Sequence, residues 1–179
     1  VDGSILASGS KGSDRTIEIL DISNSKIIAT LKMDNDNPEE VKFIQFSPNG
    51  KLMAASSLNN KEIIKIWTMD NMKEWRTLDL SDNKELAGIV IKSMTFSPDS
   101  NYLVSGLSSG NVLIYDISSN LRRTLNLHSK PVVALGFTND SKYLISGGLD
   151  KSAIYTDINN DEVSYWLKLK GDFNLNEVR

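Results

Sequence analysis

The chain has one histidine, His128, and no cysteine, so few of its side chains could act as a base, a nucleophile or a metal ligand. The missing cysteines exclude disulfides, thiolate metal sites and cysteine nucleophiles. A base–nucleophile pair or a histidine-based metal site would depend on His128 alone. Buried polar groups normally have hydrogen-bond partners, and Asp150 lies across an expected strand–turn boundary from His128. We therefore expect a structural role for His128, with no catalytic residue and no metal site in the chain.

A second set of candidate residues consists of aspartates at repeat-equivalent turn or strand-end positions: Asp14, Asp99, Asp116, Asp140 and Asp157. Carboxylates at such positions usually accept hydrogen bonds from nearby backbone N–H groups, so we predict turn chemistry here rather than catalysis. The acidic segment 34–40 lacks the glycine and the spacing to a terminal glutamate that an EF-hand loop has, which favours a solvated loop over a calcium site. The glycine-containing segment 105–110 precedes a strand rather than a helix, which argues against a phosphate-binding loop. We expect no cofactor.

Composition places the chain among ordinary globular domains. Its 179 residues are enough for one domain with a hydrophobic core, and no linker or change in composition divides them. We therefore predict a single domain over residues 1–179. The net charge of −3 gives no strong attraction for nucleic acid or anionic lipid. No apolar run approaches the roughly 18–20 residues of a membrane span, and no signal peptide is visible.

One segment recurs along the chain: an aromatic residue, a polar turn, and an apolar strand that ends in small residues. It reads FSPNGKLMAASS from Phe46, FSPDSNYLVSG from Phe96 and FTNDSKYLISGG from Phe137, and the related DGSILASGS starts at Asp2. The three phenylalanines are 50 and 41 residues apart. A repeat of roughly 40–45 residues built from short strands is typical of a β-propeller.

Within each repeat, short β-type runs alternate with turns, which predicts blades of four antiparallel strands. The first repeat contains only three such runs, at 5–7, 16–20 and 27–31. The other repeats contain four runs each, at 41–46, 52–55, 63–67 and 75–80; at 91–96, 102–104, 112–115 and 123–127; and at 132–137, 143–145, 153–155 and 163–169. We therefore predict an all-β propeller of about four blades, whose first blade lacks its innermost strand.

These degenerate repeats resemble those of the WD40 family over nearly the whole chain. The stretch SGSKGSDRTIEILD at 8–21 is similar to the family's Ser-Gly-Ser and Asp-x-Thr-Ile-x-Ile-Trp-Asp elements. In that family a histidine, a serine and an aspartate join the tryptophan of the Trp-Asp pair in a buried hydrogen-bonded network. The resemblance implies such a network of His128, Ser146 and Asp150. Its fourth member is missing, because Thr156 stands where the tryptophan would be.

The resemblance also implies a function: a non-catalytic scaffold that presents blade loops to a protein partner in a multiprotein assembly. The contact face would be formed by the turns between second and third strands and by the turns between blades. On this chain that face would include Lys11, Asn59, Lys61, Ser109, Lys130 and Lys151. Because these positions are mostly basic, we expect an acidic protein partner.

Two alternatives belong to other functional classes. One is an RNA-processing or chromatin-associated subunit that contacts nucleic acid, which the mild negative charge disfavours. The other is a propeller enzyme, for which one histidine and no cysteine are a poor basis. In each case we expect an intracellular protein, cytoplasmic or nuclear, that does not contact a membrane.

Four blades with a three-stranded first blade leave open sheet edges, which soluble proteins avoid. We therefore expect a native protein of about seven blades, within the usual propeller range, of which this chain is a part. Residues 172–179 would form a C-terminal tail or begin a further strand. A closed four-bladed ring, or closure by another chain, is the alternative.

Overall fold

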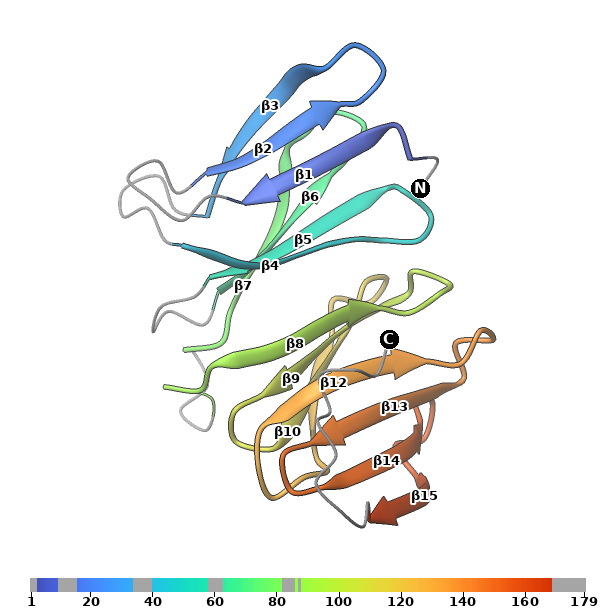
Figure 1. The fold of residues 1–179 in the computed structure, drawn as a ribbon. Coiled ribbons are helices and arrows are strands. Elements are labelled where there is room, and N and C mark those ends of the chain that lie inside the picture. Colours follow the sequence, from blue (N-terminus) through green and yellow to red (C-terminus); the bar gives the residue numbers. More distant parts are fainter. Residues whose placement is uncertain are drawn as a thin grey trace. The chain divides into compact units, whose positions relative to one another are not determined.

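The computed structural model of the chain describes residues 3–9, 16–33, 40–57, 63–81, 86 and 88–168. All regular secondary structure in these residues is β-strand, arranged in four antiparallel sheets (Figure 1). In every sheet, strands that follow one another along the chain are hydrogen-bonded neighbours. The first sheet has three strands and the others have four, so the predicted all-β class and strand numbers are confirmed.

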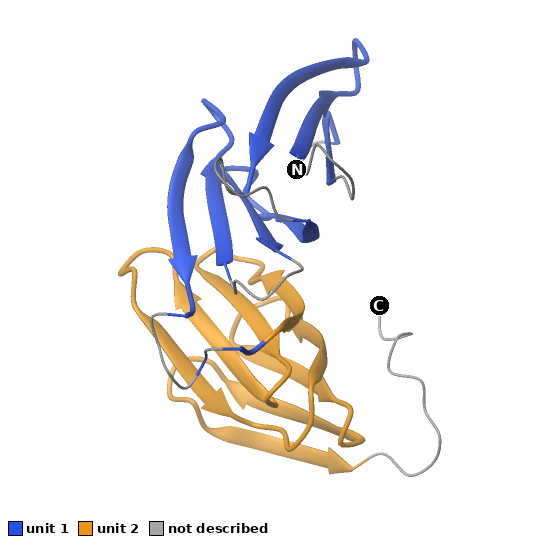
Figure 2. Cartoon of the chain, turned by 90° about the vertical axis from the view of Figure 1, so that its left-hand side faces the viewer, with its two compact units in different colours: residues 1–89 blue, residues 90–179 orange. Residues whose placement is uncertain are grey.

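The chain forms two compact units, residues 1–89 and 90–179, and each unit is described by itself (Figure 2). Whether residues 1–179 act as a single domain stays a prediction. In the first unit, the first sheet consists of β1 (Ile5–Gly9), β2 (Thr16–Asp21) and β3 (Lys26–Lys32). The second sheet consists of β4 (Val41–Phe46), β5 (Leu52–Ser57), β6 (Ile63–Thr68) and β7 (Glu74–Asp79). In the second unit, the third sheet consists of β8 (Ile91–Phe96), β9 (Tyr102–Leu107), β10 (Asn111–Asp116) and β11 (Arg122–Asn126). The fourth sheet consists of β12 (Val132–Phe137), β13 (Tyr143–Gly148), β14 (Ser152–Asp157) and β15 (Val163–Lys168).

The second strand of each repeat is longer than predicted. In β9 the ladder continues to Leu107, which lies opposite Ile91, and in β13 it continues to Gly148, which lies opposite Val132. The sequence pattern weakens at these points because the side chains become small. The strands continue because a β-ladder uses backbone groups, which every one of these residues supplies.

The core of the first unit lies between its two sheets. Ile17 and Ile19 of β2 are fully buried, whereas Glu18 between them is exposed, as expected for a strand with one face covered. They pack in one cluster with Met53 of β5 and Trp67 of β6. The first sheet is therefore held to the second by apolar packing.

The core of the second unit is formed in the same way. Val104 of β9 and Ile114 of β10 are fully buried in a cluster with Val132 of β12 and Leu144 of β13. One face of the third sheet is thereby covered by one face of the fourth. These two sheets form a rigid base for the loops at their ends.

The other face of the fourth sheet is apolar and largely exposed. We call it the outer face of the fourth sheet, and it comprises Tyr143, Ile145, Ala153, Tyr155, Tyr165 and Leu167, which adjoin one another in the strand register. The Tyr143 and Tyr155 rings are stacked with centroids 4.7 Å apart, and the Tyr165 ring meets Tyr155 edge-on. Tyr165 is 74% exposed and Leu167 is 61% exposed.

Candidate functional site

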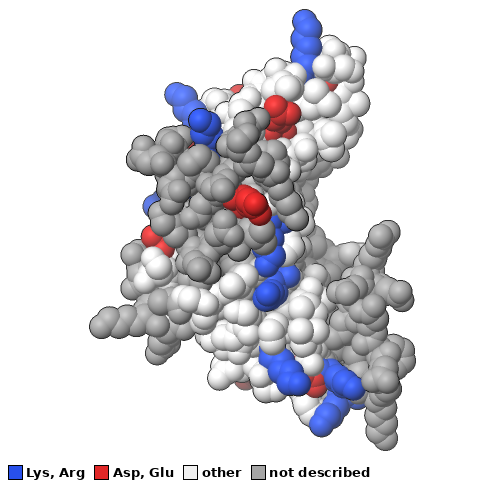
Figure 3. Space-filling model, turned by 60° about the vertical axis from the view of Figure 1, so that its left-hand side comes forward, with Lys and Arg blue, Asp and Glu red and all other residues white. Residues whose placement is uncertain are grey.

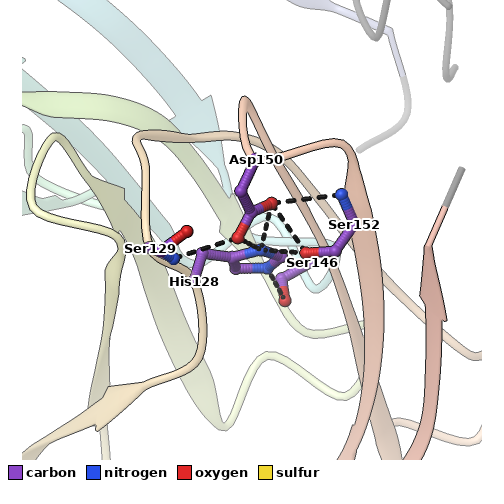
Figure 4. Close-up of polar contacts among 5 residues, drawn as sticks. All are labelled: His128, Ser129, Ser146, Asp150 and Ser152. Carbon is purple, nitrogen blue, oxygen red and sulfur yellow. Dashed lines mark hydrogen bonds and ion pairs between the residues drawn. The ribbon is translucent and has the colours of Figure 1, made fainter.

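His128 lies in the connection between β11 and β12, and its side chain is enclosed by polar groups of β13 and β14 and of the turn between them (Figure 4). Nε2 is 2.9 Å from the Ser146 hydroxyl, and Nδ1 is 3.1 Å from a carboxylate oxygen of Asp150. The structure thus brings the three predicted residues together. With Nδ1 facing a carboxylate, the geometry suits an imidazole that donates from Nδ1 and accepts from the Ser146 hydroxyl at Nε2.

Asp150 is the most densely hydrogen-bonded member of this network. Its carboxylate accepts hydrogen bonds from the Ser152 hydroxyl at 2.6 Å, the Ser152 N–H at 3.1 Å and the Ser129 N–H at 2.9 Å. Burial raises the pKa of Asp150, but the hydrogen bonds from Ser152, Ser129 and His128 outweigh it and lower the pKa to about 2. The carboxylate is therefore ionised at neutral pH and holds its donors in place.

Ser152 belongs to the network although the sequence did not single it out. Its hydroxyl oxygen lies 2.9 Å from His128 Nδ1 as well as 2.6 Å from Asp150. A signal for it was present, because Asp150 and Ser152 have the spacing of the Asp-x-Thr element, with serine in place of threonine. The network therefore contains two serines, one on each side of the imidazole.

Thr156 stands at the tryptophan position of β14 and does not extend the network. Its side chain is fully buried, yet its hydroxyl has no hydrogen-bond partner. The Ser105 hydroxyl of β9 is also buried without a partner. Ser105 occupies in the third sheet the position that Ser146 occupies in the fourth, since they lie opposite Met94 and Leu135 at equivalent points of the ladders. Of these two serines, therefore, the one in the fourth sheet is bonded to a histidine.

Gly148 allows the end of β13 to approach this network. A Cβ atom on Gly148 would lie 2.5 Å from His128 Nδ1 and 2.6 Å from a carboxylate oxygen of Asp150. Any side chain here would therefore displace the two groups from each other. Gly148 is part of the site because the absence of a side chain leaves room for the contact between His128 and Asp150.

The network also joins three loops at one end of the second unit. The His128 N–H donates to the Gly110 carbonyl at 3.0 Å, and the Leu149 N–H donates to the Pro131 carbonyl at 2.9 Å. We call the resulting surface the loop edge, defined as residues 108–110, 128–131 and 149–151. Three predicted contact residues lie on it with exposed side chains: Ser109, Lys130 and Lys151. The other three, Lys11, Asn59 and Lys61, lie outside the described residues.

The repeat-equivalent aspartates have the predicted turn role wherever the structure describes them. Asp99, Asp116, Asp140 and Asp157 each accept a hydrogen bond from the backbone N–H two residues further on, over 3.0, 2.8, 3.1 and 3.0 Å respectively. Asp14 lies outside the described residues. Within the part of the chain that is described, no cluster of three histidine or acidic side chains could hold a metal ion.

The site's chemistry follows from its enclosure. The His128 side chain has no exposed surface, and Ser146 is fully buried, so an external reactant would not reach the Nε2–Oγ pair. Both imidazole nitrogens face partners within the protein. Such an arrangement fixes the positions of loops and does not expose a nucleophile.

Among the described residues there is no helix long and apolar enough to span a bilayer.

Comparison with known proteins finds similarity to proteins that contain WD repeats. The sequence profile of the family described as "WD domain, G-beta repeat" matches residues 83–116 and 119–156. Eukaryotic translation initiation factor 3 subunit I of Saccharomyces cerevisiae is 25% identical over 162 residues, which cover 84% of this chain and 46% of that protein. WD repeat-containing protein 91 homolog of Dictyostelium discoideum is 29% identical over 141 residues, 76% of this chain and 18% of that protein.

Among solved structures, a chain in the crystal structure of the mitotic checkpoint complex matches with a TM-score of 0.74 and 18% sequence identity. The match covers 92% of this chain and 48% of that chain, and at this identity it establishes the fold alone. The chain thus spans about half or less of the length of these similar proteins.

Proposed function

Because this chain belongs to the WD40-repeat proteins of β-propeller fold, we propose that it is a non-catalytic scaffold that binds a protein partner through the loop edge. The observation that carries the proposal is the hydrogen-bonded connection of the β9–β10, β11–β12 and β13–β14 loops to one another. Loops fixed in this way present a preorganised surface, so little conformational entropy is lost on binding.

The enclosed histidine network supports a scaffold over an enzyme. His128 faces Ser146, Asp150 and Ser152, and each of these contacts serves to position a strand end or a turn. A catalytic base has to reach a proton of its substrate, and a side chain without exposed surface does not meet that condition.

Site-specific photo-crosslinking tests this proposal. A photoreactive amino acid replaces Ser109 or Lys130 on the loop edge, and Asn139, which is exposed at the opposite ends of the strands, serves as the control. We expect discrete crosslinked protein species in cell extract from the first two positions and not from Asn139. Equal crosslinking from all three positions, or none from the loop edge, would refute the assignment of this surface.

The place of action follows from the same proposal. We infer an intracellular protein of the cytoplasm or nucleus, since one similar protein is named as a translation initiation factor subunit. Direct contact with nucleic acid is the alternative function, and an RNA-binding assay with salt titration tests it. Binding that weakens steeply with salt would favour that alternative.

We also infer that the outer face of the fourth sheet packs against a further sheet, either of a longer form of the protein or of another chain. Val104 and Ile114 of the third sheet are fully buried beneath the fourth sheet. Ile145 and Tyr155 occupy the same register positions in the fourth sheet, where Ile145 is 39% exposed. Positions that bury apolar side chains in one sheet therefore expose them in the next, which indicates that a covering partner is required.

Light scattering of the purified chain tests this second inference. We expect concentration-dependent self-association that Tyr165→Lys reduces, because Tyr165 lies on the outer face. The control is Leu121→Lys, which adds the same charge at a 70% exposed apolar residue outside that face. A compact monomer at all concentrations would mean that the chain covers this face itself.

A further inference from the structure

The second unit has an uneven distribution of charge, which follows from its strand order. At the end where β8, β12 and β14 begin, the described ionisable residues besides His128 are four lysines and one aspartate, a formal charge of +3: Lys92, Lys130, Lys151, Lys168 and Asp150. At the opposite end the residues that the structure describes include six carboxylates and three cations, a formal charge of −3: Asp99, Asp116, Asp140, Asp157, Asp161 and Glu162 against Arg122, Arg123 and Lys142.

The four lysines lie on and beside the loop edge, and all four are exposed. Lys168 ends β15 and lies opposite Ser152, the residue after Lys151. Figure 3 shows the side on which β8, β12 and β14 begin. Over the second unit, the surface seen from this side has more lysine and arginine (blue) than aspartate and glutamate (red). Four elements distant in sequence thus place their cations at one end of the unit.

Among the described residues, the one carboxylate at this end, that of Asp150, is already hydrogen-bonded within the protein. The Asp150 oxygens accept hydrogen bonds from Ser129 and Ser152 and face His128. At the opposite end a cation is itself engaged within the protein: Arg123 forms an ion pair with Asp161 at 2.9 Å and also donates a hydrogen bond to the Ile158 carbonyl. The lysine end therefore keeps a positive potential that a ligand can meet.

From this charge distribution we propose that the loop edge binds an acidic segment of the partner protein, with Lys130 and Lys168 as the main contacts for its carboxylates. The proposal rests on the scaffold function above and names the chemistry of the partner. Lys92 and Lys168 extend the site beyond the residues that the loop pattern alone indicates. Carboxylates that approach from this side are attracted, whereas the opposite end repels them.

An acidic peptide fits this surface better than a nucleic acid. The positive region is confined to one end of a unit whose other end is negative, so a long polyanion would extend from attraction into repulsion. Nucleic-acid sites also combine basic side chains with stacking aromatics, and the loop edge, residues 108–110, 128–131 and 149–151, contains no aromatic side chain other than the buried His128. A short acidic segment requires neither an extended basic track nor stacking.

Fluorescence anisotropy with the whole chain tests the proposal. The probe is a fluorescein-labelled peptide of alternating glutamate and serine, compared with the same peptide carrying glutamine and with oligouridylate of equal length. We expect only the glutamate peptide to bind. Lys130→Glu and Lys168→Glu should each weaken it about fivefold, since an exposed ion pair is lost and a repulsion replaces it. Lys142→Glu is the matched control with the same charge change at the opposite end, and it should alter affinity less than about twofold.

The outcomes of the anisotropy and crosslinking experiments separate the acidic-partner proposal from the scaffold function. Equal weakening by Lys130→Glu and Lys142→Glu would show that net charge alone drives binding, and would overturn the proposal. Preference for oligouridylate would overturn it in favour of nucleic acid. No binding of the glutamate peptide, together with crosslinks from Ser109 and Lys130, would leave the scaffold function standing and reject the acidic partner. Loss of those crosslinks as well would reject both.

Discussion

The serines of β9 and β13 offer a matched test of what the histidine network contributes to stability. Ser146→Ala and Ser105→Ala each remove one hydroxyl from a serine that is at most 1% exposed, so each variant loses the same buried group. Ser146→Ala leaves His128 Nε2 buried without its partner at 2.9 Å, which should cost about 2 kcal/mol. Ser105→Ala removes a hydroxyl that has no partner, so we expect a neutral effect or a gain of up to about 1 kcal/mol.

The two variants should therefore differ by about 2–3 kcal/mol in free energy of unfolding, which for a chain of this size is roughly 5–10 °C in Tm. Urea titration followed by circular dichroism measures the difference. In a His128→Ala background the penalty of Ser146→Ala should disappear, because the coupling partner is gone. If the two serine variants are equally stable in the wild-type background, the network contributes no net stability and the reasoning is wrong.

Three further predictions concern residues of β13, of β14 and of the turn between them. Gly148→Ala should lower the free energy of unfolding by about 2 kcal/mol in urea titration, because its Cβ would lie 2.5 Å from His128 Nδ1, whereas Gly136→Ala, which meets nothing within 4 Å, should be neutral. The folded-state pKa of Asp150 is lowered to about 2, so its contribution is complete above about pH 4 and is lost as pH falls toward 2. Between pH 5 and pH 2 the wild type should therefore lose about 1–2 kcal/mol more than Asp150→Asn, and equal losses would contradict this. Thr156→Val should raise Tm by a few degrees, about 1 kcal/mol, because it replaces an unpartnered buried hydroxyl with a methyl group; a lower Tm would point to a partner for that hydroxyl.

Much of the fold could be predicted because each sheet repeats one pattern of apolar runs and turns. The bounds of β4 and β12 agree with prediction at both ends, since a polar turn follows each of them directly. Prediction was less accurate where pairing continues through small residues, as at the end of β13, because side-chain hydrophobicity falls before the backbone ladder stops.

The site shows a similar division between predictable and unpredictable features. A lone histidine in a strand-rich chain needs polar partners, and this need together with the family resemblance pointed to Ser146 and Asp150. Ser152 was missed because serines are common and only its spacing from Asp150 distinguishes it. The unpartnered hydroxyl of Thr156 could not be predicted, because it depends on which groups surround that position in three dimensions.

The outermost strand of the fourth sheet has a practical consequence for handling the protein. All six residues of β15 are exposed, and the segment VSYWLK has strong β-propensity, one charge and no proline. A strand of this kind is a template for pairing between molecules, which leads over time to fibrous or amorphous precipitate. Lys168 at its end and Glu162 directly before it are the charged side chains that bound this largely uncharged run. Dilute samples, in which such pairing between molecules is infrequent, should therefore keep longer than concentrated ones.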